Sequence, residues 1–286
     1  GKVMISSSPP ATIWINNKSY GNSPMTISLP AVTQQIVFKK KGHRLVSKTI
    51  KPTGKFVQKV SAKLLTEYQA RLQESPRELT NKEGIKLKLF INPGYLKMGA
   101  PRSQKGQRAN EFQKKIRLTK SFYASIFEIT NGQYGKFKPS LRKSLGADNI
   151  PVTSIDWNEA ASFCNWLSKN EGLQPFYNIV NERVSGFNKN TDGYRLLSEA
   201  EWEWLSRKAG KTKQTIFSWG DEMVIPPNAA NISDEGAKGQ MEFYVPNYND
   251  GYVSAAPVGS FKKELSGLYD IAGNVSEWVH DIYSTM

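Results

Sequence analysis

Residues 267–278 place the tightest constraint on how this chain can fold. They read G-L-Y-D-I-A-G-N-V-S-E-W, in which apolar side chains are interspersed with two carboxylates, Asp270 and Glu277, and two glycines. Glycine lets a backbone carbonyl turn inward where a Cβ atom would block the approach. Carboxylates and inward carbonyls suit a hard cation such as Ca2+, which takes about 6–8 oxygen ligands. By themselves, these residues favour a plainer interpretation: a turn with a buried aromatic anchor and two solvated acids.

The length and composition favour a folded chain with more than one domain. A chain of 286 residues can form two domains, and 38% hydrophobic with 11% aromatic residues argues against disorder. No apolar run approaches the roughly 18 residues of a membrane span, so no span is predicted.

The net charge of +14 favours attraction to polyanions such as nucleic acid, anionic lipid or acidic envelope polymers. The excess of cations is strongest in residues 1–63 and again around residues 97–120. The basic run at 39–41 has no nucleic-acid recognition motif around it. The sequence therefore favours a solvated basic face and predicts no specific nucleic acid partner.

The single cysteine limits the chemistry. With Cys164 alone, these residues can form no internal disulfide, no cysteine-rich zinc site and no two-cysteine redox pair. The two histidines, His43 and His280, are far apart in the sequence and do not predict a metal cluster.

Residues 2–65 show the pattern of a small all-β unit. Four segments, at 3–7, 11–15, 25–29 and 34–39, partly alternate apolar and polar residues, which is the period of a half-buried strand. Clusters of Pro, Asn, Gly and Ser between them predict turns, and short strands at this spacing predict a β-sandwich.

The same residues resemble the PEGA domain family. The matching run is S-S-P-P-A-T-I-W-I-N-N-K-S-Y-G-N-S-P at 7–24, followed by K-K-K-G-H-R at 39–44, with His43 where Tyr or Phe is commoner. The resemblance implies a non-catalytic module of bacterial envelope or exported proteins. It therefore implies an extracytoplasmic location, in the periplasm or cell envelope.

The rest of the chain divides into a connector and a larger domain. Residues 66–84 are polar, with a weak helical stripe that Pro76 would interrupt, so the predicted units are 1–65, a connector at 66–84, and 85–286. Capping boxes beginning at Thr130, Asp156 and Ser198 predict three helix starts. The second helix should bury a stripe of Ala160, Phe163, Cys164 and Leu167 and end at Gly172. Residues 210–267 show little periodicity, so an ordered loop region of that length needs another means of support.

The order of these motifs resembles the formylglycine-generating enzyme (sulfatase-modifying factor) family. Leu197, where the family usually has Pro, and Ser276, where an aromatic is usual, depart from its pattern. The resemblance implies an irregular α+β fold related to C-type lectins, with bound calcium. The fold class predicted for the whole chain is thus α+β, a small β-sandwich followed by this domain. The matching stretches are at 94–99, 121–137, 151–167, 194–204, 217–222, 230–234, 257–261 and 267–278.

Carrying the family's calcium positions over implies two oxygen-donor sets. One consists of Asn231, the carbonyl of Ile232, Asp250 and the carbonyl of Tyr252; the other of Asp270, the carbonyls of Gly273 and Val275, and Glu277. Structural Ca2+ of this kind would contribute directly to the free energy of folding of the long loops.

The sequence does not contain the residues that carry catalysis in the family's enzymes. The family's enzymes carry an R-G-G-S-W strand and a copper-binding cysteine pair downstream of the G-N-V-x-E-W motif, whereas this sequence stops at Met286, and we expect its domain to lack that C-terminal segment. Cu(I) requires soft thiolate ligands, which one helical cysteine cannot provide, so no copper is expected. We find no catalytic residues, no further cofactor-binding residues, and no Ser/His/Asp set or P-loop.

Two functions remain open. The first is a non-catalytic envelope interaction protein that binds a protein or glycan partner. The second is a truncated oxygen-dependent oxidase whose catalytic cysteines lie beyond residue 286, and the sequence favours the first. Candidate contact aromatics are Trp157, Trp219, Tyr244, Tyr248 and Tyr252, with a core position favoured for each one singly.

Overall fold

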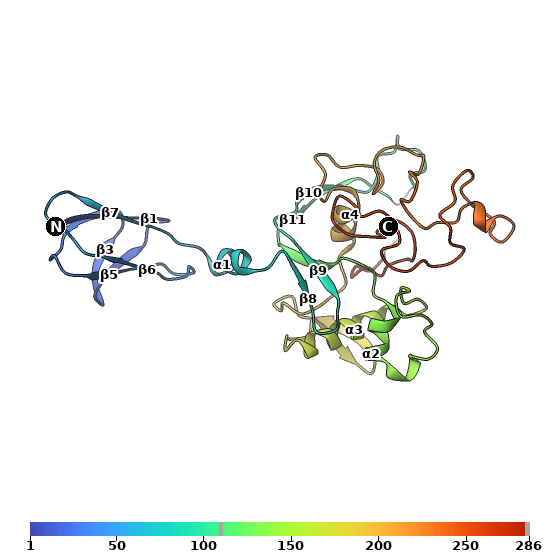
Figure 1. The fold of residues 1–286 in the computed structure, drawn as a ribbon, viewed down its shortest axis with the longest axis horizontal. Helices are drawn as coiled ribbons and strands as arrows, with labels where there is room; N and C mark the ends of the chain where they lie inside the picture. The colour runs from blue at the N-terminus through green and yellow to red at the C-terminus, as the bar shows by residue number, and fades with distance from the viewer. Residues whose placement is uncertain (109–110, 284–286) are drawn as a thin grey trace. The chain divides into compact units, whose positions relative to one another are not determined.

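The computed structural model describes residues 1–108 and 111–283, which form two compact units, Gly1–Pro76 and Arg77–Met286 (Figure 1). We call them unit 1 and unit 2 and describe each by itself.

Unit 1 is a sandwich of two sheets, as predicted. One sheet has the order β4-β1-β7, formed by β4 (Met25–Ser28), β1 (Lys2–Ser8) and β7 (Gln58–Lys63). The other has the order β3-β2-β5-β6, formed by β3 (Lys18–Asn22), β2 (Thr12–Ile15), β5 (Gln34–Lys39) and β6 (Val46–Ile50). The four predicted strands are β1, β2, β4 and β5. The sequence did not reveal three strands: β3, whose residues are all exposed; β6, which has no fully buried residue; and β7, which pairs in parallel with β1.

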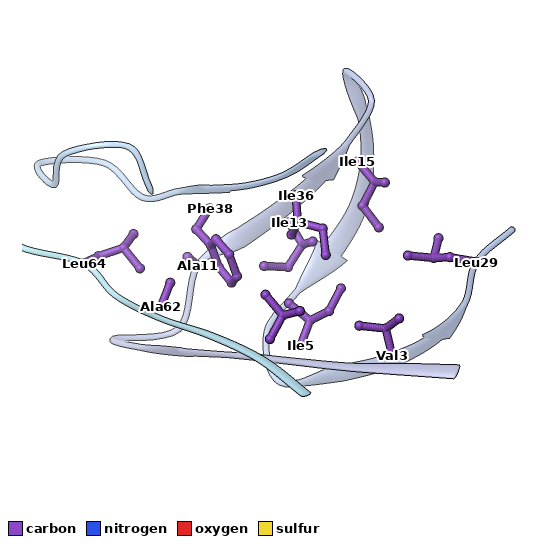
Figure 2. Close-up of a cluster of buried hydrophobic side chains, with 11 residues drawn as sticks. Val3, Ile5, Ala11, Ile13, Ile15, Leu29, Ile36, Phe38, Ala62 and Leu64 are labelled. Atoms are coloured by element: carbon purple, nitrogen blue, oxygen red, sulfur yellow. The ribbon is translucent and has the colours of Figure 1, made fainter. Parts of the chain in front are cut away.

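Alternate residues of the two sheets form the core of unit 1 (Figure 2). Val3 and Ile5 of β1 point toward Ile13 of β2 and toward Ile36 and Phe38 of β5, and all five are fully buried. Because successive strand residues point to opposite faces, the intervening residues stay on the outer surfaces.

A short helix, α1 (Glu67–Glu74), closes unit 1. It begins at Thr66, whose capping box with Gln69 the sequence analysis missed, and it ends before Pro76. The guanidinium of Arg44 contacts Glu67 and Glu74, which fixes the helix to the end of the sandwich.

Unit 2 has short sheets, three main helices and long loops, which confirms the predicted α+β class. The sheets have the orders β12-β9-β8, β10-β11 and β13-β14. In Figure 1, α2 lies beside α3, and α4 packs against β10 and β11. The strands are β8 (Glu78–Thr80), β9 (Lys86–Phe90), β10 (Gly94–Met98), β11 (Lys114–Leu118), β12 (Phe122–Ser125), β13 (Tyr177–Val180) and β14 (Arg183–Phe187). The helices are α2 (Asn131–Phe137), η1 (Pro139–Leu141), α3 (Trp157–Asn170), α4 (Glu199–Arg207) and η2 (Glu235–Ala237).

The three predicted capping boxes are confirmed. In each, the side chain of the N-cap residue accepts a hydrogen bond from the backbone N–H three residues on, at the starts of α2, α3 and α4. The predicted stripe of α3 is buried, and Gly172 follows the helix with φ +73°. None of the helices in the described residues is both long and apolar enough to span a membrane.

The first half of the 267–278 motif belongs to the core beside α4. Leu268 and Ile271 are buried with Trp204 and Leu205 of that helix. Tyr269 stacks on Phe127 with ring centroids 4.8 Å apart. This packing anchors Asp270, between two core residues, at one end of an open groove.

Candidate metal centre and groove

A groove of about 780 Å³ lies between α4 and the 267–278 motif. Its lining comes from α4, from residues 216–219, from residues 231–233, from residues 270–277 and from Val279. Six of the eight residues predicted to ligate calcium line it: Asn231, Ile232, Asp270, Gly273, Val275 and Glu277. Asp250 and Tyr252 are not among the lining residues, although Asp250 accepts a hydrogen bond from the N–H of Ile232.

The two predicted donor sets meet at one backbone contact. Asn231 and Gly273 form an isolated parallel β-bridge, and the N–H of Asn274 donates to the carbonyl of Asn231 at 2.8 Å. Gly273 has φ +85°, and a Cβ atom added to it would lie 2.0 Å from the carbonyl oxygen of Asn231. Only glycine therefore permits this approach.

Asp250 organises the first set through its backbone neighbours. Its two carboxylate oxygens accept the N–H groups of Ile232, at 2.9 Å, and Tyr252, at 2.8 Å. Asp234, which the sequence analysis missed, is 1% exposed and accepts the N–H of Asp250 at 2.5 Å. Its place in the A-N-I-S-D stretch gave no sign that it would be buried.

Asp270 has one satisfied oxygen and one unsatisfied oxygen. The side chain is 4% exposed, and Oδ2 accepts the N–H of Gly259 at 2.5 Å. Among the described residues, Oδ1 is buried without a hydrogen-bond partner. Burial raises the pKa of this carboxyl above its ordinary value. A buried oxygen left without a partner destabilises the folded state by about 1–3 kcal/mol. Oδ1 of Asp270 is therefore the oxygen of this site that is most clearly available to bind a cation.

Asn274 connects both sets to a carboxylate that the sequence analysis did not identify, Glu128. Asn274 Nδ2 donates to Glu128 Oε2 at 2.8 Å, and its Oδ1 accepts from Asn231 Nδ2 at 3.0 Å. Glu128 Oε1 is buried and has no partner within the described part of the chain. Burial is the main reason that the pKa of Glu128 rises to about 8, and the charge of Asp270 adds to it. Glu128 and Asn274 are 146 positions apart, so no local sequence pattern could show that they lie close together.

Three indole N–H groups form hydrogen bonds that hold the C-terminal end of the 267–278 motif in place. Trp202 of α4 donates to the carboxylate of Glu277, whose side chain is exposed on the groove wall. Trp278 donates to the carbonyl of Ile155 at 3.0 Å, and Trp157 donates to the carbonyl of Val279 at 2.7 Å. These bonds hold the groove wall against α3 and α4.

The donors present fit a calcium ion better than a transition metal. Both hydrogen bonds that Asn231 makes through its amide use Nδ2, which leaves Oδ1 as its donor oxygen. An ionised carboxylate keeps lone pairs beyond those that Asp250 and Glu277 already use. Groups of three or more His, Cys, Asp or Glu side chains suited to a metal do not occur in residues 1–108 and 111–283. The two predicted calcium sets are of a different kind, because each has at most two carboxylates and its other ligands are amide and backbone oxygens, which suit Ca2+.

The candidate contact aromatics take different positions. Tyr248 is buried, and its hydroxyl donates to the carbonyl of Ala230 at 2.7 Å. Trp157 and Tyr244 are half-buried, whereas Tyr252 is 37% exposed. Trp219 is half-buried, lines the groove and stacks on Phe217 with centroids 4.9 Å apart. Trp219 is therefore the candidate best placed to touch a groove ligand.

Cys164 lies in the core of α3 and should be chemically inert in the folded protein. It is 8% exposed, and burial raises the pKa of its thiol to about 12. Because the thiolate is the reactive form, we expect no labelling by iodoacetamide at about pH 8 until a denaturant is added. Mass spectrometry of labelled peptides provides the measurement, and rapid labelling of the native protein would contradict this assignment.

Comparisons with known proteins identify the family of each part of the chain. The family model described as "Sulfatase-modifying factor enzyme 1-like domain" matches residues 73–286, and the PEGA domain model matches residues 1–67. The chaperone protein LppX of Paenibacillus barcinonensis is 26% identical over 198 residues, which cover 63% of this chain and 69% of that protein. The formylglycine-generating enzyme of Streptomyces coelicolor is 31% identical over 140 residues, which cover 49% of this chain and 34% of the enzyme.

The solved structure of Treponema denticola variable protein 1 has the same fold over most of this length. Its TM-score is 0.55 at 21% identity, and the match covers 74% of this chain and 79% of that one. The matched region spans only about a third of the Streptomyces enzyme, so it establishes relationship and not activity. The chain belongs to the family of sulfatase-modifying factor enzyme 1-like domains and carries a PEGA domain in front of that domain.

Proposed function

We propose that this chain is a non-catalytic interaction protein of the bacterial cell envelope, in which calcium holds the loops of unit 2 in place for a protein or glycan partner. The observation that carries the proposal is the buried Oδ1 of Asp270 at the end of an open groove, an atom with no hydrogen-bond partner in residues 1–108 and 111–283. A cation there would satisfy this oxygen and would fix both walls of the groove. The groove would then present a stable surface for binding.

Two further observations support a binding role. The only cysteine in the sequence is buried on α3, away from the groove. The matched relative from Paenibacillus barcinonensis, 69% of which is covered, is named a chaperone protein and not an enzyme. The extracytoplasmic location rests on the PEGA domain.

Removal of calcium should lower the thermal midpoint of unit 2. Excess EDTA withdraws an ion that binds only the folded state, and a ligand present at about 100 times its dissociation constant contributes about 2.7 kcal/mol. Added Ca2+ should restore the midpoint, whereas Mg2+ should restore it poorly because it demands a rigid octahedral shell and dehydrates reluctantly. Differential scanning calorimetry measures the shift.

A pair of variants makes the calcium test specific. Asp270→Asn keeps an oxygen that can accept from Gly259 but removes the charge, so its response to EDTA should shrink. Glu182→Gln removes one exposed carboxylate from a turn outside the groove and should leave the response intact. The calcium assignment fails if EDTA does not shift the midpoint of the unmodified chain.

The partner itself can be sought by placing a photo-crosslinking amino acid in the groove wall. Ser276 is exposed and lines the groove, whereas Val180 is 59% exposed on β13 and does not. Crosslinking in the source cells should give a discrete adduct from position 276 that disappears with EDTA, and none from position 180. Identical adducts from both positions, or none from position 276, would contradict a binding role for the groove.

The second candidate function is an oxygen-dependent oxidase. The 31% identity to a formylglycine-generating enzyme over 140 residues favours it. Peptide mapping of the native protein, followed by oxygen-uptake assays with Cu(I) and a thiol peptide, separates the two functions. A cysteine pair together with copper-dependent oxygen uptake would establish the oxidase and displace the binding role.

A further inference from the structure

The positive charge of the chain is concentrated in the β-sandwich. Residues 1–66 contain ten Lys and one Arg but no Asp or Glu, so they hold eleven of the fourteen net positive charges. One of these cations, Arg44, is neutralised by Glu67 and Glu74 of α1. Because the strands and their turns hold no carboxylate, the lysines on them have no counter-charge within the sandwich.

Three of these cations, Lys39, Lys40 and Lys41, line a second groove, of about 860 Å³, at one end of the β3-β2-β5-β6 sheet. We call it the lysine groove. Strand register brings its walls together, since Thr12 of β2 pairs with both Lys39 of β5 and Asn22 of β3. Its lining residues are Pro10, Ala11, Thr12, Trp14, Asn22, Lys39, Lys40, Lys41, His43 and Leu45.

The lysines are held in place and not merely exposed. The ammonium of Lys39 lies 4.1 Å from the centre of the Trp14 ring, which is a close cation–π contact. Lys40 Nζ donates to the carbonyl of Pro10 at 3.1 Å, which leaves two of its three N–H groups for a ligand. Lys41, in the turn that follows, is exposed. The groove therefore offers two positioned cations and a third at its rim.

The uncharged side chains of the lysine groove could bind a sugar through hydrogen bonds and apolar contacts. The hydroxyl of Thr12 donates to Asn22 Oδ1 at 3.0 Å, so the amide N–H groups of Asn22 remain as donors toward a ligand. Pro10 and the exposed Leu45 supply apolar surface beside the polar groups. A sugar ring that carries a carboxylate offers the complement: one negative charge, several hydroxyls and apolar C–H faces.

We propose that the lysine groove binds an acidic polysaccharide, with uronate carboxylates against Lys39, Lys40 and Lys41. Single-stranded nucleic acid fits less well, because it is held by stacking on free aromatic faces and Lys39 already covers a face of Trp14. This site lies in unit 1 and does not depend on the function proposed for unit 2.

The test uses the full 286-residue chain and polygalacturonate as the probe, at about 0.1 M NaCl, where long-range surface charge is screened. The variant Lys39→Gln/Lys40→Gln/Lys41→Gln should bind about tenfold more weakly. The control Lys51→Gln/Lys55→Gln/Lys59→Gln removes three exposed charges from the same unit outside the groove, and should lose less than about threefold. Because all six side chains are exposed, circular dichroism melting curves should be unchanged.

A charge-neutral variant and three comparison probes complete the design. Asn22→Ala should weaken binding about threefold although it removes no charge, which a diffuse electrostatic field would not explain. Dextran, a neutral polymer, should not bind. The proposal is overturned if the two triple variants lose affinity equally, if polygalacturonate does not bind, or if a DNA duplex or phosphatidylglycerol vesicles bind more tightly than polygalacturonate.

Discussion

Gly273→Ala is expected to destabilise unit 2 by about 3–5 kcal/mol, which is large for a single methyl group. The new Cβ would lie 2.0 Å from the carbonyl oxygen of Asn231, and the backbone has φ +85°. The Cβ atom is fixed rigidly to the backbone and its partner is a main-chain oxygen, so no side chain can rotate to relieve the contact. The bridge between Asn231 and Gly273 must open, and with it the junction of the two predicted calcium sets.

Urea unfolding followed by tryptophan fluorescence measures this loss, since six of the seven tryptophans belong to unit 2. Gly251→Ala is the matched control. That glycine has nearly the same φ, +86°, but no atom lies within 4 Å of the added Cβ, so only about 1 kcal/mol of backbone strain is expected. Equal losses in the two variants would show that the bridge contributes nothing beyond backbone conformation.

The second large effect is a pH dependence of stability in the presence of EDTA. The pKa of Glu128 is about 8 in the folded protein, against an ordinary value of 4.5. A raised pKa means that the folded state holds the proton more tightly, so this stabilisation is full below pH 4.5 and is lost as the pH rises through 8. At about 1.4 kcal/mol per pKa unit, we expect the free energy of unfolding to be about 3–5 kcal/mol higher near pH 5 than near pH 9.

The variant Glu128→Gln isolates this contribution. Glutamine keeps an oxygen that can accept from Asn274 but cannot ionise, so most of the pH dependence above pH 5 should disappear. The burial of Asp270 raises its pKa as well and adds a smaller slope of the same sign. Glu182→Gln, exposed in a turn, should leave the profile unchanged. A flat profile for the unmodified chain between pH 5 and 9 would contradict the burial of an ionisable Glu128.

Local patterns predicted the elements whose stability is local. The Thr130, Asp156 and Ser198 capping boxes identified three helix starts because their hydrogen bonds span three residues. Alternation identified β1, β2, β4 and β5, which each pack one face against the core, although that face of β4 is only partly buried. It could not identify β3, where residues 18–22 are all exposed and no face is buried.

The candidate site was predictable only in part, because its residues are brought together by long-range packing and not by a local pattern. The resemblance supplied Asn231 and Asp270, and the glycine of the G-N-V motif indicated where a backbone would approach closely. Glu128 and Asn274 are 146 positions apart, and their hydrogen bond follows from the packing of β12 and the motif around α4. Packing of that kind leaves no periodic trace in the sequence.

The bridge between Asn231 and Gly273 also couples two loops, the one that carries Asn231 and the one that carries Gly273. Without the bridge, each loop would have to be ordered independently of the other. Ordering a loop costs about 1–2 kcal/mol per residue in backbone entropy. An ion that fixes Asp270 and Glu277 would, through the bridge, restrain the loop that carries Asn231 and Asp250. A second ion would then meet a loop that is already ordered and would bind more tightly than it could alone. The two calcium ions would therefore bind cooperatively, and the binding curve measured by calcium titration would be steeper than that of two independent sites.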